Sequence, residues 1–133
     1  MVRRFYDAFS RGRPIEEVGA EFESYLHPNA EYVNPPDAVE PGTRRGRSEF
    51  RGALESIAEG LGHEAKFTID SLEERAGRLL VILSIQTGGT VSGVEVAGPT
   101  IGAVWTVEDG LVRRLQWCWD PSDARAIFER QAD

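Results

Sequence analysis

The sequence predicts an α+β fold in which helices precede a curved antiparallel sheet. Three observations carry this prediction: apolar residues recur at helical spacing before residue 62, the apolar period changes to two from Ala65 onward, and glycine-containing turns separate the later apolar runs. Helices followed by short strands are typical of one antiparallel sheet with its helices on one face. The chain has 133 residues, and we expect a single domain over residues 1–133.

Two short amphipathic helices are expected first. Four apolar side chains share one face of the first helix: Val2, Phe5, Tyr6 and Phe9. Gly12 and Pro14 separate it from the second, since glycine commonly follows helices and proline commonly begins them. The apolar residues of the second helix are Ile15, Val18, Phe22 and Leu26. It is expected to stop at His27, because Pro28 disfavours helical backbone in the residue before it.

A short strand, a loop and a third helix are expected next. The strand is "AEYVN", residues 30–34, and two prolines follow it. The segment over residues 35–47 is rich in proline and glycine and is expected to be a loop. Ser48 is the candidate N-cap of the third helix. Its apolar face carries Phe50, Leu54, Ile57 and Leu61.

Four or five strands complete the predicted fold. After the alternation at Ala65, Phe67 and Ile69, apolar runs with β-branched residues occupy residues 78–87, 90–96, 100–107 and 111–119. The outward face of the long strands, with Val81, Leu83 and Ile85 or their alternates, is apolar. We therefore expect a homodimer that buries the outer sheet face.

The final strand indicates a pocket. Strict alternation gives it two faces, the first with Leu111, Arg113, Leu115, Trp117 and Trp119, and the second with Val112, Arg114, Gln116, Cys118 and Asp120. The tryptophan face is the more apolar and is expected to be concave, together with Trp105. These side chains either line a ligand cavity or simply fill the core. Asp120 points away from them unless the strand bends at Pro121.

Composition excludes several classes of function. The formal net charge of −7 makes nucleic acid an unlikely partner, because both would be polyanions. No apolar run is long enough for a membrane span, and the start of the chain has no apolar core of a signal peptide. The single cysteine, Cys118, fits a reducing compartment, so a cytoplasmic location is expected. Two histidines and one cysteine without close ligand spacing predict no metal site, and we expect no cofactor.

Few side chains are candidates for chemistry. His27 lies at the predicted helix end, where an imidazole either caps the helix or orients a bound carbonyl. Arg44, Arg45, Arg47 and Arg51 form a local basic cluster. These arginines either bind an anionic group or pair with glutamates at the surface, and the second arrangement is the commoner one.

The sequence as a whole resembles a known family. The segments "VRRFYDAFSRG", "YLHPNAEYVNPP", "GTRRGRSEFRGAL", "SGVEVAGP" and "VWTVEDGLVRRLQWCWD" are similar to the SnoaL-like branch of the nuclear transport factor 2-like superfamily. This resemblance implies a cone-shaped, cystatin-like fold, in which a curved antiparallel sheet of four to six strands wraps around three N-terminal helices. It also implies an apolar cavity and dimerisation through the outer sheet face. Members include ketosteroid isomerases, polyketide cyclases and epoxide hydrolases.

The resemblance can be tested position by position. Where ketosteroid isomerases have a tyrosine, a catalytic aspartate and a protonated aspartate, this chain has Phe5, Asn34 and Ala103. Their mechanism is therefore not expected. SnoaL-type polyketide cyclases use an aspartate late in the last strand as acid and base, and Asp120 matches that position.

Two functions follow from the sequence. In the first, a small apolar organic molecule enters a cavity, and Asp120 transfers protons in an isomerase or cyclase reaction. The residues expected to line the cavity are Phe5, Phe9, Tyr32, Asn34, Trp105, Leu115, Trp117 and Trp119, with Tyr32, Asn34 or His27 orienting a carbonyl. In the second, the protein is a dimeric binding or accessory module that has a pocket but no chemistry.

Overall fold

The computed structural model describes residues 20–35, 42–61, 66–86, 90–91, 94–95 and 100–130. The expected first helix, with Phe5 and Phe9, and most of the second lie outside these residues, and residues 20–23 are helical. The elements are β1 (Leu26–Asn34), β2 (Gly42–Arg45), α3 (Arg47–Leu61), β3 (Lys66–Arg75), β4 (Arg78–Gln86), β5 (Thr90–Val91), β6 (Val94–Glu95), β7 (Thr100–Glu108), β8 (Leu111–Cys118) and α4 (Pro121–Arg130).

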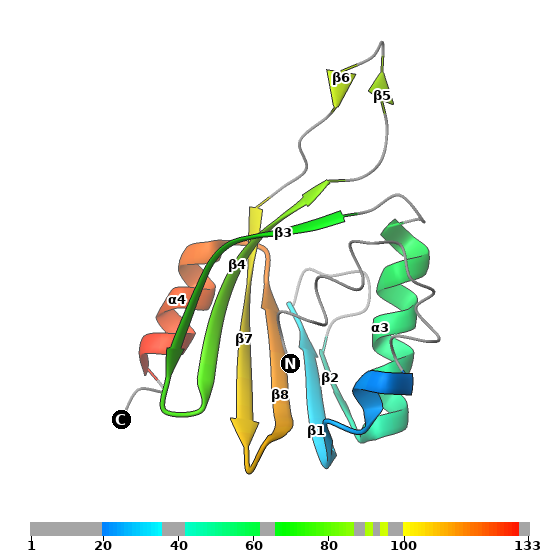
Figure 1. The fold of residues 1–133 in the computed structure, drawn as a ribbon, viewed down its shortest axis with the longest axis vertical. Coiled ribbons are helices and arrows are strands. Elements are labelled where there is room, and N and C mark those ends of the chain that lie inside the picture. The colour runs from blue at the N-terminus through cyan, green and yellow to red at the C-terminus, as the bar shows by residue number, and fades with distance from the viewer. Residues whose placement is uncertain are drawn as a thin grey trace.

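Six of the strands form one curved sheet that is not closed, so the predicted α+β class is confirmed (Figure 1). The strand order is β2-β1-β8-β7-β4-β3, and β5 pairs only with β6. Neighbours are antiparallel except for β1 and β8, which are parallel. The expectation of a purely antiparallel sheet is therefore wrong at this pair. The long connection from β1 to β8 allows a parallel pairing that a tight hairpin cannot make.

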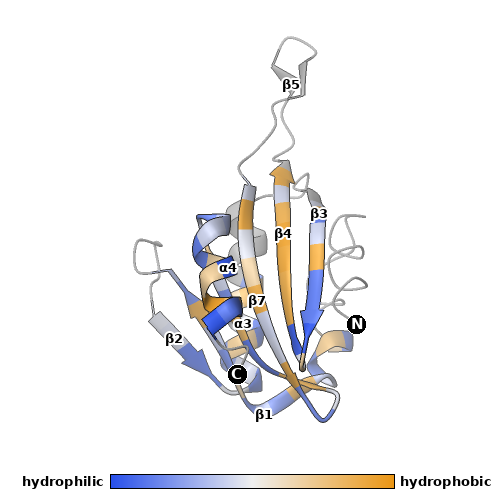
Figure 2. Ribbon diagram, turned by 90° about the vertical axis from the view of Figure 1, so that its left-hand side faces the viewer, coloured by the Kyte–Doolittle hydropathy of each residue, from blue (hydrophilic) through white to orange (hydrophobic). Residues whose placement is uncertain are grey.

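The main core lies between one face of the sheet and α3. Apolar residues at helical spacing on α3, among them Phe50 and Leu54, are buried against alternate residues of the strands. On β4 these alternate residues are Val81, Leu83 and Ile85. The sequence left open which alternating set faces outward: Val81, Leu83 and Ile85 face inward, and their alternates Leu80 and Ile82 pack toward α4. Figure 2 shows β4 as a largely hydrophobic strand.

The opposite face of the sheet is covered by α4. Leu80 of β4, Val104 of β7 and Cys118 of β8 pack against Ala124 and Phe128 in a second apolar cluster. Figure 1 shows α4 and α3 on opposite sides of the sheet. The expectation that all helices lie on one face is therefore wrong, and β7 is buried on both faces.

Several element boundaries also differ from the prediction. The second helix gives way to β1 at Leu26, which extends the strand predicted for residues 30–34 toward the N-terminus. Residues 42–45 were assigned to a loop but form β2 and pair with the end of β1. The third helix begins at Arg47, one residue before its predicted cap Ser48, and its first turn closes through the Phe50 N–H and the Gly46 carbonyl.

Candidate functional site

An aromatic wall lies between the inner face of the sheet and the helical segments that cover it, and consists of Phe22, Tyr32, Phe50 and Trp105. The Tyr32 ring meets the Phe50 ring edge-on, with centroids 5.2 Å apart, and the Phe22 ring meets the Trp105 ring edge-on at 5.8 Å. Tyr32 and Trp105 are both 0% exposed. Edge-to-face contacts of this kind favour a fixed arrangement of the rings. The rings therefore have a defined packing arrangement and are buried within the described part of the chain.

Leu115 and Trp117 lie beside this wall on β8. Tyr32 of β1 pairs with Leu115, so Trp117, two residues further along, is the diagonal neighbour of Tyr32 on the same face. The Tyr32 hydroxyl interacts with the Trp117 side chain. It makes no hydrogen bond of regular geometry within the described part of the chain. Burial raises the pKa of Tyr32 well above its ordinary value, so the phenol stays neutral.

A second feature is an open groove of about 870 Å³ at the ends of β1 and β8 beside α4, which we call the outer groove. Its lining comes from the end of β1, the start of β2, the end of β8 and one side of α4. The lining residues are Val33, Asn34, Pro35, Gly42, Gln116, Trp117, Cys118, Trp119, Asp120, Asp123, Ala126, Ile127 and Arg130. Four candidates from the sequence, Asn34, Trp117, Trp119 and Asp120, thus border this groove.

Asp120 begins α4. Its Oδ1 accepts hydrogen bonds from the Ser122 N–H at 2.8 Å and from the Ser122 hydroxyl at 2.7 Å. Its carbonyl accepts from the N–H groups of Asp123 and Ala124, and Pro121 occupies the first helical position. This is the geometry of an N-cap aspartate followed by proline. The bonds from Ser122 hold the pKa of Asp120 below its ordinary value, and the side chain is exposed.

Trp119 lies outside the strand in which it was predicted. Strand β8 ends at Cys118, and the Trp119 side chain is 50% exposed. The predicted alternation is correct from Leu115 to Cys118. It is wrong before Leu115, because a register shift between β7 and β8 directs the Val112 side chain into the inner core. Trp119 therefore borders the outer groove and does not extend the aromatic wall.

Cys118 lies in the wall of the groove and is buried. Burial raises the pKa of its thiol, and the negative charges of Asp123 and Asp120 raise it further. A thiol in such a field stays protonated and is a poor nucleophile. The same charges make this part of the groove acidic.

The two polar side chains expected to orient a ligand lie at opposite ends of β1. His27 is the second residue of the strand, and its Nδ1 accepts a hydrogen bond from the Asn29 N–H at 3.0 Å. Asn34 is the last residue. Seven residues of extended chain span roughly 23 Å, so the two side chains cannot both orient one small molecule. Ala103, the third isomerase position, is buried in the inner core.

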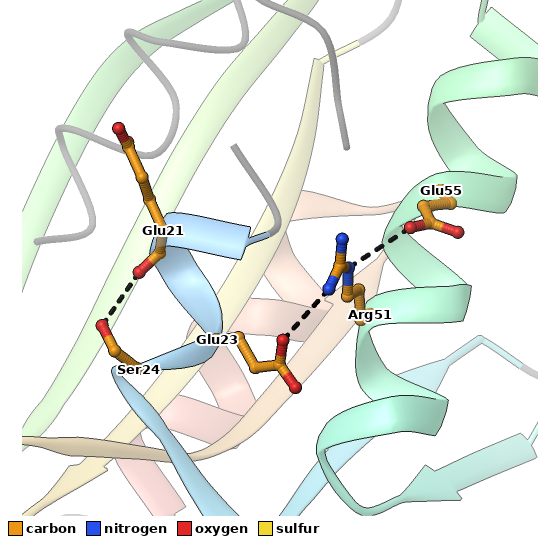
Figure 3. A network of polar contacts seen from close by, with 5 residues as sticks. All are labelled: Glu21, Glu23, Ser24, Arg51 and Glu55. Atoms are coloured by element: carbon orange, nitrogen blue, oxygen red, sulfur yellow. Dashed lines mark hydrogen bonds and ion pairs between the residues drawn. The ribbon is translucent and has the colours of Figure 1, made fainter. Parts of the chain in front are cut away.

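The basic cluster is held by partners within the chain. Arg45 pairs with Glu31 at 3.2 Å, and the Arg47 side chain donates to the Leu26 carbonyl at 3.0 Å. Arg51 lies between Glu23 and Glu55, with nitrogen–oxygen distances of 3.1 and 3.4 Å (Figure 3). These contacts tie α3 to β1 and to the residues before it. For these three arginines, pairing within the chain is the arrangement found.

The part of the groove lining that α4 supplies was not predicted from the sequence. One side of α4 lines the groove with Ala126, Ile127 and Arg130. Another side of the helix is buried against the sheet through Ala124 and Phe128. The helix itself could be predicted from "PSDARAIFER", because the apolar residues of this segment follow helical spacing. Knowing the helix does not reveal which face of the sheet it covers.

Neither a metal cluster nor a membrane-spanning helix occurs in the described part of the chain. Within residues 20–35, 42–61, 66–86, 90–91, 94–95 and 100–130, no group of three or more His, Cys, Asp or Glu side chains is placed to hold a metal ion. In the same residues, no helix has the length and apolar character needed to cross a membrane.

Comparisons with known proteins identify the fold. The model of a family described as the SnoaL-like domain matches residues 2–115. No curated protein matches the chain.

Solved structures of similar fold include a nuclear transport factor 2-like protein of unknown function from Burkholderia pseudomallei K96243. It has a TM-score of 0.67 and 21% identity, over 92% of this chain and 89% of that one. TerC, co-crystallised with polyporic acid, has a TM-score of 0.65 and 20% identity, over 96% and 95% of the two chains. A protein with a ketosteroid isomerase-like fold from Catenulispora acidiphila DSM 44928, in complex with trimethylamine, has a TM-score of 0.64 and 13% identity, over 87% and 82%.

Proposed function

The chain belongs to the SnoaL-like domain family, and we propose that it is a binding module that holds a small, largely apolar organic molecule against the inner face of its sheet without acid–base chemistry. The observation that carries this proposal is the aromatic wall of Phe22, Tyr32, Phe50 and Trp105. Sites for small organic ligands are mostly lined by apolar and aromatic side chains with a few polar groups.

The energy available from such a wall suits a ligand of modest size. Covering about 200 Å² of apolar surface on a planar ligand gives about 5 kcal/mol at 25 cal/mol per Å², before the cost of association. Dissociation constants of about 0.2 mM or weaker are therefore expected for simple aromatic probes. Because the wall is covered by the chain, a bound molecule would be enclosed. Small organic molecules also accompany two structural neighbours, TerC co-crystallised with polyporic acid and the Catenulispora protein in complex with trimethylamine.

A second candidate function is proton transfer by Asp120. It is favoured by the position of Asp120 on the wall of the groove, beside Trp119 and Asn34. Against it stands the role of the carboxylate as the cap of α4, in which Oδ1 already accepts two hydrogen bonds. A general base near neutral pH needs a raised pKa, whereas the pKa of Asp120 is lowered. We therefore favour ligand binding over proton transfer by Asp120 as the function.

One experiment separates the two functions. The ketone 2-acetylnaphthalene is titrated into the protein by calorimetry, and exchange of its acetyl protons with deuterium from D₂O is followed by NMR. We expect binding by wild-type protein and by Asp120→Asn alike, with no acceleration of exchange over buffer. The asparagine amide of this variant can still cap the helix, so a loss of activity in it would not reflect unfolding. Accelerated exchange that Asp120→Asn abolishes would favour the enzyme instead.

Assembly as a homodimer through the outer sheet face stays a prediction. The apolar surface that motivates it is smaller than the sequence indicated, because α4 covers Leu80 and packs against Ile82. What supports it now is the outer groove and the half-exposed Trp119 beside it. An exposed indole next to an open groove is a surface that a second copy would bury favourably.

A further inference from the structure

We propose that the outer groove is a second binding site and that it takes an organic cation, a protonated amine that carries a small apolar group. The groove holds about 870 Å³, which is in the range of sites for small molecules, and none of the four residues of the aromatic wall lines it. The proposal goes beyond the function proposed above, because it assigns a different class of ligand to a different site.

The first support is the negative charge in the groove. Asp120 and Asp123 are exposed and line it, and neither forms an ion pair with any residue that the structure describes. The negative charges of both raise the pKa of the buried Cys118 thiol. Elsewhere, exposed or half-buried carboxylates pair with arginines, and these are Glu23, Glu31, Glu55 and Glu73. The groove thus carries an acidic surface that the described chain does not neutralise, and such a surface attracts cations.

This negative charge is concentrated at the first turn of α4. Arg130 is the only basic residue among the described residues that line the groove. It follows Asp123 by seven residues on the helix, which separates their backbones by about 10 Å along the helix axis. The helix N-terminus itself contributes about half a positive charge, which the two carboxylates of Asp120 and Asp123 outweigh. A bound cation is therefore expected beside the first turn.

The second support is the indole of Trp119. This side chain is 50% exposed, lines the groove and directly precedes Asp120 in the chain. Tryptophan is the aromatic residue whose ring face attracts a cation most strongly. Because Trp119 and Asp120 are adjacent and both line the groove, one ammonium group can contact the ring and a carboxylate together. An exposed indole beside unpaired carboxylates thus suits an amine.

The third support is the apolar part of the lining. Val33 at the end of β1 and Ala126 and Ile127 of α4 line the groove, and a ligand gains free energy by covering such side chains with an apolar group. A bare metal ion would gain nothing from them. Moreover, in the part of the chain that the structure describes, no three His, Cys, Asp or Glu side chains are placed to hold a metal ion. The cation that fits is therefore a small alkyl- or arylammonium ion.

The test compares two probes of matched shape, benzylamine, which is protonated at neutral pH, and neutral benzyl alcohol. Each is titrated into the protein while the indole N–H resonance of Trp119 is followed by ¹H–¹⁵N NMR. Benzylamine should shift this resonance saturably and bind about tenfold more tightly than benzyl alcohol, the ratio given by one cation–π contact and exposed ion contacts.

Two double variants locate the effect. Asp120→Asn with Asp123→Asn should reduce the ratio to about threefold, which the cation–π contact alone supplies, and asparagine at position 120 can still cap α4. The matched control is Asp109→Asn with Glu129→Gln, which removes the same charge from exposed side chains that do not line the groove. The control should keep the tenfold ratio.

Several results would overturn the proposal. Equal affinities of wild-type protein for the two probes would do so, as would a ratio that both double variants reduce alike. A Trp119 resonance that benzylamine leaves unmoved would also do so, and a light-scattering mass twice that of the chain would then assign the groove to a second copy. The ratio in wild-type protein is measured without any variant, so the test holds even if a double variant fails to fold.

Discussion

At the residue scale, the carboxylate of Asp120 is held by two hydrogen bonds from Ser122 in the first turn of α4. An aspartate in this position satisfies N–H groups that the helix itself cannot pair, and its charge suits the positive end of the helix dipole. The hydrogen bonds from Ser122 account for the lowered pKa of the side chain. The position of Asp120 thus has a structural explanation that requires no substrate.

The cap predicts how stability depends on pH. Asp120→Ala should melt at a lower temperature than Asp120→Asn at pH 7, because asparagine can cap a helix and alanine cannot. The folded pKa of Asp120 is depressed, so its charge contributes stability above the unfolded pKa of about 3.9 and loses it as pH falls through the folded value. The advantage of wild-type protein over Asp120→Asn should therefore be constant above about pH 5 and shrink below about pH 4.

Thermal unfolding monitored by circular dichroism across this pH range measures the effect. Ser122→Ala serves as the control, because it removes the hydroxyl donor at 2.7 Å and keeps the backbone donor at 2.8 Å. It should reduce the pH-dependent advantage without removing it. Equal melting temperatures for wild-type protein and Asp120→Ala at pH 7 would show that the cap contributes nothing.

The residue pattern of β8 shows where prediction from sequence succeeds and where it stops. Alternation placed Trp117 inward and Cys118 outward correctly, because these residues lie in a regular part of the strand. Alternation predicted the wrong face for Val112, because the register shift at this point depends on the partner strand β7. It could not place Trp119, since the strand ends one residue earlier. Tyr32 was expected at the site from sequence, but its burial beside Phe50 and Trp117 depends on contacts between distant segments.

At the element scale, α4 approaches β7 more closely than an ordinary side chain would allow. A Cβ atom on Gly102 would lie 2.5 Å from the Cβ of Ala124. This small-residue contact sets the distance of α4 from the sheet and allows Phe128 and Leu80 to pack together. The Ala124 Cβ is fixed to the helix backbone and cannot rotate away, so an added methyl group must move the helix.

Gly102→Ala should therefore destabilise the protein, by about 1–3 kcal/mol, because overpacking forces the helix off the sheet. The free energy of unfolding in urea measures this. Gly52→Ala in α3 is the control, since nothing lies within 4 Å of the position that its Cβ would take, and it should stabilise by about 0.5–1 kcal/mol. The double change Gly102→Ala with Ala124→Gly should recover part of the loss, at a cost of about 1 kcal/mol for glycine in a helix. A neutral Gly102→Ala would contradict the close contact.

The elements themselves were largely readable from the sequence. Period and turn residues identified α3, β3, β4, β7 and β8, since these depend on local pattern. The single strand predicted for residues 90–96 was wrong, because β5 and β6 lie there and pair with each other. The parallel pairing of β1 with β8 and the face chosen by α4 depend on contacts between distant segments. No local pattern carries that information, so both were missed.

At the scale of the whole molecule, helices on both faces cover the sheet, and two sites of different character result. The inner one is aromatic and covered, while the outer groove is open and carries Asp120 and Asp123. If the outer side forms a homodimer, light scattering should give twice the mass of the chain. Trp119→Lys should then shift the protein toward monomer by placing a charge in the interface. Tyr25→Lys, at another exposed aromatic residue, should not.

A monomeric mass for wild-type protein at the highest concentration that stays soluble would contradict the homodimer. It would leave the binding function untouched, because the inner wall is built from one chain.

Binding of a small organic molecule at the aromatic wall can be tested directly through the tryptophans. Trp105 is fully buried in the aromatic wall, whereas Trp119 is half exposed at the outer groove. Their indole N–H resonances, assigned by Trp→Phe variants, are followed by ¹H–¹⁵N NMR during titration with 2-acetylnaphthalene. Binding at the aromatic wall predicts saturable shifts for Trp105 and none for Trp119. A shift of Trp119 with Trp105 unchanged would place the ligand in the groove and contradict binding at the wall.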